Sequence, residues 1–352
     1  MARFLLEDAE IIYSAAPETA VNTPYTTSAD FKSALVNSMM PPVPQLGKIK
    51  DNQVGGANEW GRKSRNIYWQ PFDLPIGGML NTEIAAALAA RAFGGSTTNT
   101  VITTGASWDH FVALQTKAQG RIPKLTTLAF LLGGYDFLHA SLAVDTFEIN
   151  FGGDASPEWS ATLRNTGNSF QRVGDLDPAI VVPSLPSYHY MHPAAILATF
   201  NDGSLRDFAA DARLISGRCG IGNSIVVKPH PGDPFRTAGD RRTGAYMRDI
   251  HRGKRTYTPT IKVSMDEDLA EWVTARDNTD ITDLTFVFKG DPIGVTPESY
   301  EFEIKYPLSN LMVESDTDDT DAALNLSFDI DREDASGGIA ILRVRNGSAT
   351  LV

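Results

Sequence analysis

The segment 125–167, LTTLAFLLGGYDFLHASLAVDTFEINFGGDASPEWSATLRNTG, decides the fold class. Two glycine turns, at Gly133-Gly134 and at Gly152-Gly153, divide it into three stretches of strand length. In the second and third stretches apolar residues alternate with polar ones, which is typical of a strand with one buried face. The apolar positions are Val144, Phe147, Ile149, Phe151, Trp159, Ala161 and Leu163. The segment therefore predicts three consecutive antiparallel strands in a sheet with one buried face.

One α-helix is predicted at 82–93. Asn81 or Thr82 can cap its N-terminus, and Glu83 suits the first turn because its charge complements the helix dipole. An alanine-rich run continues to Phe93, and Gly94-Gly95 is typical of a helix end. We expect this helix to lie across the core of the first domain. A second, shorter helix is predicted at 266–275, with a loop as the alternative.

Length and composition predict two β-rich domains. The chain has 352 residues, and 42% of them are hydrophobic. This length exceeds that of a typical domain with a single hydrophobic core. A proline-rich stretch at 183–193, PSLPSYHYMHP, places the expected boundary between 1–185 and 186–352. The order of strands and glycine turns is similar on both sides, so we expect two related β-domains. The fold class predicted is therefore mainly antiparallel β, a sandwich or barrel, with one flanking helix.

Composition also excludes some classes of protein. The single cysteine, Cys219, excludes an internal disulfide framework and a site with several thiolate ligands. The sequence has no run of about 18 apolar residues, and acidic residues stand near the N-terminus where a signal peptide is apolar. We therefore expect neither a membrane anchor nor secretion by that route.

The charge of the chain is unevenly distributed. Its net charge is -12, yet 256–352 holds 20 of the 43 acidic residues and only 7 of the 31 basic ones. Just before it, the loop 236–255 is basic and carries Arg236, Arg241, Arg242, Arg248, Arg252, Lys254 and Arg255. We expect this basic loop to pair with an acidic surface of a neighbouring subunit. A solvated loop and a DNA-binding patch remain as alternatives.

The acidic C-terminal part contains two dense carboxylate clusters. One holds Asp316, Asp318, Asp319 and Asp321, and the other lies at 329–334. Their spacing does not fit an EF-hand, because Asp321 stands where that loop needs glycine and Ser327 where it needs glutamate. A solvated acidic surface is the favoured interpretation, and calcium binding stays open. An acidic wall would also suit a channel that passes DNA, since it does not hold phosphates.

The sequence carries no recognisable catalytic motif. It lacks a GxSxG elbow, an HExxH pair, a P-loop and a GxGxxG turn. His189, His192 and His230 lie among prolines, which favours loops over a helical metal-binding face. We therefore expect no enzyme activity, no cofactor and no metal site.

Three parts of the chain together resemble the major tail tube protein family of long-tailed bacteriophages. They are 12–33 (IYSAAPETAVNTPYTTSADFKS), the three-strand segment 125–167, and 300–315 (YEFEIKYPLSNLMVES) followed by 337–351 (GGIAILRVRNGSATL). The resemblance covers about half of the chain and is carried by an ordered pattern rather than by a motif. It implies a β-sandwich or barrel with a flanking helix, assembled into stacked rings around a channel for DNA.

The resemblance makes the expected role structural. The hairpin formed by 137–151 and 159–163 would contribute Val144, Phe147, Ile149, Phe151, Trp159 and Leu163 to an inner barrel shared between subunits. The basic loop would connect rings. The chain would form a hexamer, or a trimer of pseudo-sixfold symmetry if its halves are duplicated, within the virion tail and after assembly in the host cytoplasm. A tape-measure protein and a tail terminator are the implied partners, and DNA would pass the lumen without specific binding.

Other classes remain open beside the tail tube. A phage baseplate or decoration protein would share such sandwiches without forming a tube. A carbohydrate-binding module would expose a row of aromatic residues, for which the sequence offers Tyr188, Tyr190, Trp60 and Trp69. A hydrolase with paired carboxylates is a further alternative, because its two carboxylates need no fixed spacing in the sequence. The long segment 45–66 could be the counterpart of the basic loop in the first half, and it is glycine-rich and polar, as a docking arm would be before it orders against a neighbour; its basic residues are Lys48, Lys50, Arg62, Lys63 and Arg65.

Overall fold

The structure is a computed structural model that describes residues 10–20, 25, 27–39, 46–50, 64–69, 73–116, 120, 122–131, 137–152, 155–165, 170–172, 183–184, 187–201, 205–207, 214–229, 247–264, 281–316, 323–330 and 340–351. Within these ranges the fold is mainly antiparallel β with one α-helix, as predicted.

The three strands predicted at 125–167 are confirmed. They are β9 (Leu125–Leu131), β10 (Phe137–Gly152) and β11 (Ala155–Asn165), and β10 pairs antiparallel with both neighbours. The strand β11 alternates between buried and exposed residues, as expected. In contrast, β9 is buried on both faces, because Leu128 and Phe130 pack into the main core while Ala129 packs with a second cluster.

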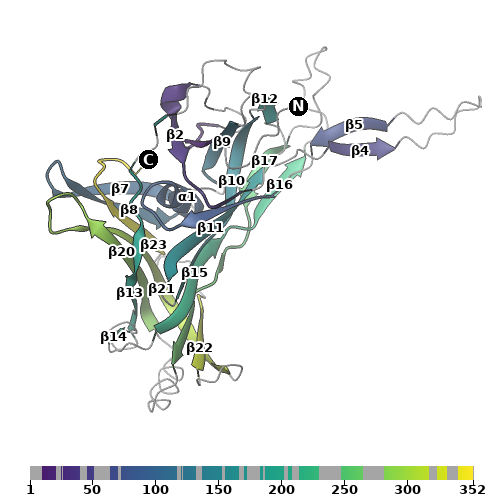
Figure 1. The fold of residues 1–352 in the computed structure, drawn as a ribbon. Helices are drawn as coiled ribbons and strands as arrows, with labels where there is room; N and C mark the ends of the chain where they lie inside the picture. The colour runs from purple at the N-terminus through teal and green to yellow at the C-terminus, as the bar shows by residue number, and fades with distance from the viewer. Residues whose placement is uncertain are drawn as a thin grey trace, which may run out of the picture.

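Nine strands follow one another around a closed barrel (Figure 1). Antiparallel pairing links them in the order β6 (Asp73–Met79), β11, β10, β15 (Leu214–Gly222), β19 (Thr260–Ser264), β22 (Ala323–Asp329), β21 (Ser299–Asp316), β20 (Ile281–Pro292) and β13 (Met191–Asn201). A single bridge between Asn81 and Tyr190 closes the circle, supported by the Met191 N–H, which donates to the Leu80 carbonyl at 3.0 Å.

Side branches extend this barrel. From β21 the sheet continues through β23 (Ile341–Asn346) and β8 (Ser107–Leu114) to β7 (Gly94–Thr103). From β9 it continues through β1 (Glu10–Ser14) to β2 (Phe31–Ala34), which follows a 3-10 turn at Ser28–Asp30. Four short strands pair at other edges: β3 (Ser38–Met39), β12 (Phe170–Arg172), β14 (Leu205–Asp207) and β18 (Thr256–Tyr257).

Two hairpins form separate two-stranded sheets. One consists of β16 (Ile225–Pro229) and β17 (Met247–Arg252), and it shares a small apolar cluster with the body through Ile225 and Ile250. The other consists of β4 (Leu46–Lys50) and β5 (Ser64–Trp69). Figure 1 shows β4 and β5 extending away from the body.

The predicted helix is confirmed as α1 (Ile84–Phe93). The Asn81 side-chain oxygen accepts from the backbone N–H groups of Glu83 and Ala85, so Asn81 caps the helix. Gly94 ends it in the left-handed conformation, at φ 75°. All residues of α1 except Ala90 are buried, so burial is not limited to one apolar face of the helix. The reason is that α1 packs against strands on several sides: β7, β8, β10, β15 and β23. The second predicted helix, at 266–275, lies outside the described residues.

The two expected domains share one core. The main apolar cluster runs from Tyr13 to Val344 and includes the stacked rings of Phe147, Trp159 and Phe302. Strand pairs cross the expected boundary at 185/186, since β10 pairs with β15 and β8 pairs with β23. The segments on either side of 185/186 are therefore parts of one packed unit, and whether they are duplicates of one another stays a prediction.

Candidate functional site

The hairpin predicted to join subunits forms, but it belongs to the interior of its own chain. Phe147 pairs with Ala161 and Ile149 with Trp159, as expected for β10 and β11. The side chains named for assembly are all buried within the chain: Val144, Phe147, Ile149, Phe151, Trp159 and Leu163. Both edges of the hairpin are also occupied, because β10 pairs with β15 and β11 pairs with β6. These residues stabilise the fold of one subunit and leave this hairpin no free edge, which counts against a barrel that it shares between subunits; that role stays a prediction.

The basic loop is only partly a surface feature. Arg252 and Arg255 are buried, whereas Lys254 between them is exposed. Arg255 donates to the carbonyls of Gln115 and Phe93, at 2.8 and 3.3 Å, and Arg252 donates to the carbonyl of Gln115 at 3.0 Å. Arg255 therefore satisfies the Phe93 carbonyl at the C-terminus of α1, where a positive charge also complements the helix dipole, and both guanidinium groups bind the Gln115 carbonyl. They are not available to a neighbouring ring.

Most other charged residues of the basic loop and of the acidic cluster lie outside the described residues. Among them are Arg241, Arg242, Asp318, Asp319 and Asp321. The backbone places Arg248 in β17 and Asp316 at the end of β21. Pairing between a basic loop and an acidic surface stays a prediction for these positions.

The segment predicted to be a docking arm contains the β4–β5 hairpin. Lys48 pairs with Asn66 and Lys50 with Ser64 across its two strands. Its sheet has two strands and is separate from the barrel. An isolated two-stranded sheet is marginally stable in water, and a third strand or a packed face is needed for independent stability. The hairpin thus has the form expected of an arm that is completed by a neighbour.

The opposite side of the molecule carries the strand β7, which the sequence analysis did not single out. Of its ten residues, Ser96 to Ile102 are exposed, and β8 is its sole partner strand among the described residues. The sequence signal was the run STTNTVIT directly after the helix stop at Gly94-Gly95: uncharged, rich in β-branched residues and without alternation. A strand of that composition that shows no alternation has no buried face of its own.

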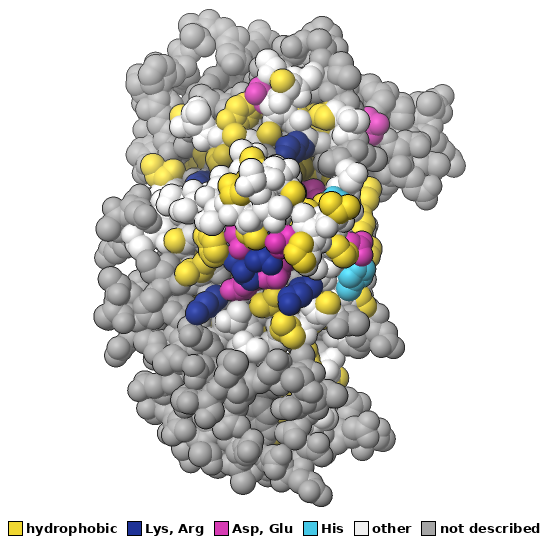
Figure 2. Space-filling view, turned by 90° about the vertical axis from the view of Figure 1, so that its left-hand side faces the viewer, with side chains coloured by type: hydrophobic (Ala, Val, Ile, Leu, Met, Phe, Trp, Pro, Cys, Tyr) yellow, Lys and Arg dark blue, Asp and Glu magenta, His cyan; other side chains and the backbone are white. Residues whose placement is uncertain are grey.

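A network of charges lies on the sheet face beside β7, at the centre of the face in Figure 2. Arg345 binds Asp109 with two parallel contacts, of 2.8 and 3.1 Å, and Arg343 contacts Glu301 and Glu303. Burial raises the pKa of Glu303 and lowers the pKa of Arg343. The mutual pairing within β8, β21 and β23 makes this network a stabilising element of the sheet.

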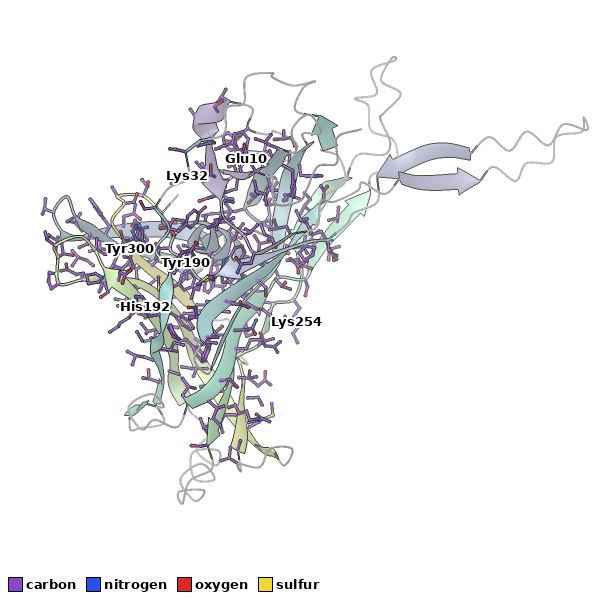
Figure 3. All side chains as sticks on the ribbon, in the orientation of Figure 1. Glu10, Lys32, Tyr190, His192, Lys254 and Tyr300 are labelled. Carbon is purple, nitrogen blue, oxygen red and sulfur yellow. The ribbon has the colours of Figure 1, made fainter. Side chains whose placement is uncertain are left out.

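A cavity with a volume of about 350 Å³ lies at the start of α1. Its lining includes Tyr13, Lys32, Glu83, His189 and Tyr300. The rings of His189 and Tyr300 stack at 3.7 Å between their centres, and the His189 backbone N–H donates to the Glu83 carboxylate at 3.3 Å. Figure 3 labels Lys32, Tyr190 and Tyr300, which lie on the side of α1 away from the β4–β5 hairpin.

Burial dominates the electrostatics of this cavity. It raises the pKa of Glu83 from 4.5 to about 7, although hydrogen bonds from Thr82 and His189 oppose the shift. It also lowers the pKa of His189 and of Lys32. Glu83 is the single carboxylate among the described lining residues, so the cavity does not hold the carboxylate pair of a glycoside hydrolase.

The described residues do not form the other sites considered. They contain no group of three or more side chains placed to hold a metal ion. Tyr188 and Tyr190 stack against one another at 6.2 Å, and the Tyr188 hydroxyl bonds to the backbone of Ser33 and Leu35. They are therefore not an open row for a sugar, while Trp60 and the side chain of Trp69 lie outside the described part. Within the described residues no helix has the length and apolar character needed to cross a bilayer.

A scan against protein-family models gave no match, and no curated protein matches the sequence.

Proposed function

We propose that this chain is a structural subunit that assembles into stacked homo-oligomeric rings of a phage tail tube, a channel for DNA. The observation that carries the proposal is the β4–β5 hairpin, which projects from a packed body as an incomplete sheet (Figure 1). Such a hairpin gains stability only when a neighbour supplies a further strand or a face.

The rest of the fold supports a structural role. The body is an antiparallel barrel with one α-helix, and the resemblance to tail tube proteins implies a β-sandwich or barrel with a flanking helix. A contact between the hairpin of one copy and a different surface of the next is heterologous, and heterologous contacts produce rings or filaments. The proposed location is the virion tail, after assembly in the cytoplasm of the bacterial host. A tape-measure protein and a tail terminator are the proposed further partners.

Sedimentation velocity at increasing protein concentration tests the proposal. We expect the wild-type chain to form discrete large species, and Ile49→Val to do the same because valine keeps the strand propensity of β4. Ile49→Pro removes a backbone N–H from β4 and should leave single subunits with the far-ultraviolet circular dichroism of the wild type. A wild-type chain that remains a single subunit at every concentration would contradict the proposal and favour a decoration or baseplate role.

A further inference from the structure

The strand β7 is an unprotected sheet edge. Several strands of the body have one partner among the described strands, but the others, β2, β3, β12, β14 and β18, are two to four residues long. By contrast, β7 has ten residues and pairs with β8 alone. Natural sheets protect such an edge with charges, proline, a short length or a covering segment, because its free N–H and C=O groups bind other strands.

Among the described residues, none of the usual protecting features is present along the exposed part of β7. The residues from Ser96 to Ile102 include no charged residue and no proline. The hydrogen bonds that reach β7 from elsewhere lie near its ends or involve a side chain: Lys124 donates to the Gly95 carbonyl at 2.6 Å, Thr103 donates to Glu298 at 3.1 Å, and the Asn99 side chain donates to Ala349 at 3.3 Å. The outer backbone edge between them has no partner among the described residues.

The β4–β5 hairpin also has strand edges without a partner among the described strands. Its two strands pair with each other, and they form a sheet of their own. Figure 1 shows β7 and the hairpin on opposite sides of the molecule, so one cannot complete the other within a chain. A contact between them must join two copies.

We propose that the outer edge of β7 binds the β4–β5 hairpin of a second copy by strand addition, so that one continuous sheet passes from subunit to subunit. This inference rests on the proposed function and names the contact surface that assembly would use. The other two-stranded sheet, β16 and β17, packs on the body through Ile225 and Ile250, whereas pairing of β7 with the β4–β5 hairpin uses in every copy two edges that have no partner strand among the described residues. Two hairpins would also repel each other through Lys48, Lys50 and Arg65, whereas β7 carries no charge.

Hydrogen-exchange mass spectrometry compares assembled protein with dispersed protein and does not depend on the register of the contact. Backbone hydrogen bonds slow exchange, so we expect peptides covering β7 and peptides covering β4 and β5 to gain protection together on assembly. A peptide from β16 and β17 serves as the control that should not change. Assembled protein in which β7 exchanges as fast as in single subunits would overturn the inference.

Cysteine cross-linking then identifies the occupant of the edge. Chains carrying Thr98→Cys are mixed with longer, tagged chains carrying Lys48→Cys or Arg65→Cys, and the buried Cys219 is retained in all of them. Disulfide-linked pairs of unequal chains in the mixture, absent from each variant alone, are the expected result. Linkage of the Thr98→Cys chain to itself would show that β7 pairs with β7, and would overturn the inference.

The two proposals fail in distinguishable ways. Rings without protection or cross-linking at β7 would leave the tail tube function intact and place the hairpin elsewhere. The absence of any assembly in the wild type would reject the proposed function, and the contact with it.

Discussion

Single residues explain why parts of the predicted basic loop do not reach a neighbour. Asn223 donates to the carbonyls of Ala92 and Val144, both at 3.0 Å, and Arg255 donates to the Asn223 oxygen at 3.2 Å. This places a buried guanidinium at the point where α1 ends and the barrel wall begins. The backbone oxygens that bind Arg255 belong to residues far away in the sequence, so the sequence around Arg255 does not show that its side chain is buried. From its charge alone, Arg255 was expected at the surface.

Replacing Arg255 with methionine should destabilise the fold. The change removes the Arg255 donor from the buried Asn223 side-chain oxygen, and a buried acceptor that loses its partner costs about 1–3 kcal/mol. Urea unfolding measures the loss. The exposed neighbour provides the control, since Lys254→Met should change the free energy of unfolding by no more than about 0.5 kcal/mol. Equal effects of both variants would contradict the buried role of Arg255.

Glu83 should make the fold less stable as the pH rises from about 4.5 to about 7. Its pKa is higher in the folded chain than the ordinary 4.5, so the folded state binds the proton more tightly than the unfolded state. The stabilisation from the protonated form is complete below about 4.5 and is lost as the pH rises through the folded pKa of about 7. His139 acts in the opposite sense, because burial lowers its pKa to about 4 and stability falls as its ring is forced to take a proton.

The difference between variants separates these two contributions. Glu83→Gln should flatten the decline in the free energy of unfolding across this range, whereas Glu158→Gln, at an exposed position of β11, should keep the wild-type profile. Urea unfolding at several pH values gives both curves. Superimposable wild-type and Glu83→Gln profiles would show that Glu83 titrates alike in the folded and unfolded states.

At the scale of elements, the local pattern predicted the three strands of 125–167 and the helix α1, but not β7. Alternation identified β11, and the glycine pairs identified the ends of β9, β10 and α1. Local pattern could not show which strands become neighbours. The pairing of β10 with β15 and of β8 with β23 joins residues far apart in sequence, and such pairing decides which edges are already occupied. For that reason the assembly role was assigned to a hairpin that has no free edge.

The effect of a charge on β10 tests this reassignment. Phe147→Asp places a carboxylate in the main core, where loss of the ring alone costs about 3–5 kcal/mol and an unpaired charge adds to it. We expect loss of the folded subunit, measured by circular dichroism and thermal unfolding. Asn150→Asp, at an exposed site of the same strand, should fold normally. A folded Phe147→Asp chain that merely fails to assemble would restore the original assignment.

At the scale of the whole molecule, the barrel closes through the start of α1. The Met191 N–H reaches the Leu80 carbonyl, and the Asn81–Tyr190 bridge lies next to it. The core on either side of 185/186 is continuous, because the aromatic rings of Phe147 and Phe302 stack across it. Composition and length indicated two domains because they show how much apolar surface a chain can bury. They do not show which residues pack together in one core.

Fragments 1–185 and 186–352 should therefore not fold separately. Each would expose strand edges and core side chains that the other covers in the intact chain. Circular dichroism and one-dimensional proton NMR of each purified fragment check this expectation. Dispersed amide and methyl signals from either fragment alone would show that the expected boundary separates independent domains.

Negative-stain electron microscopy of the concentrated wild-type chain tests the central claim, assembly into rings, most directly. We expect uniform rings, or tubes of stacked rings, with a stain-filled channel. Averaging of the particle images would then give the symmetry of the ring. Dispersed globular particles at every concentration and salt level would contradict it.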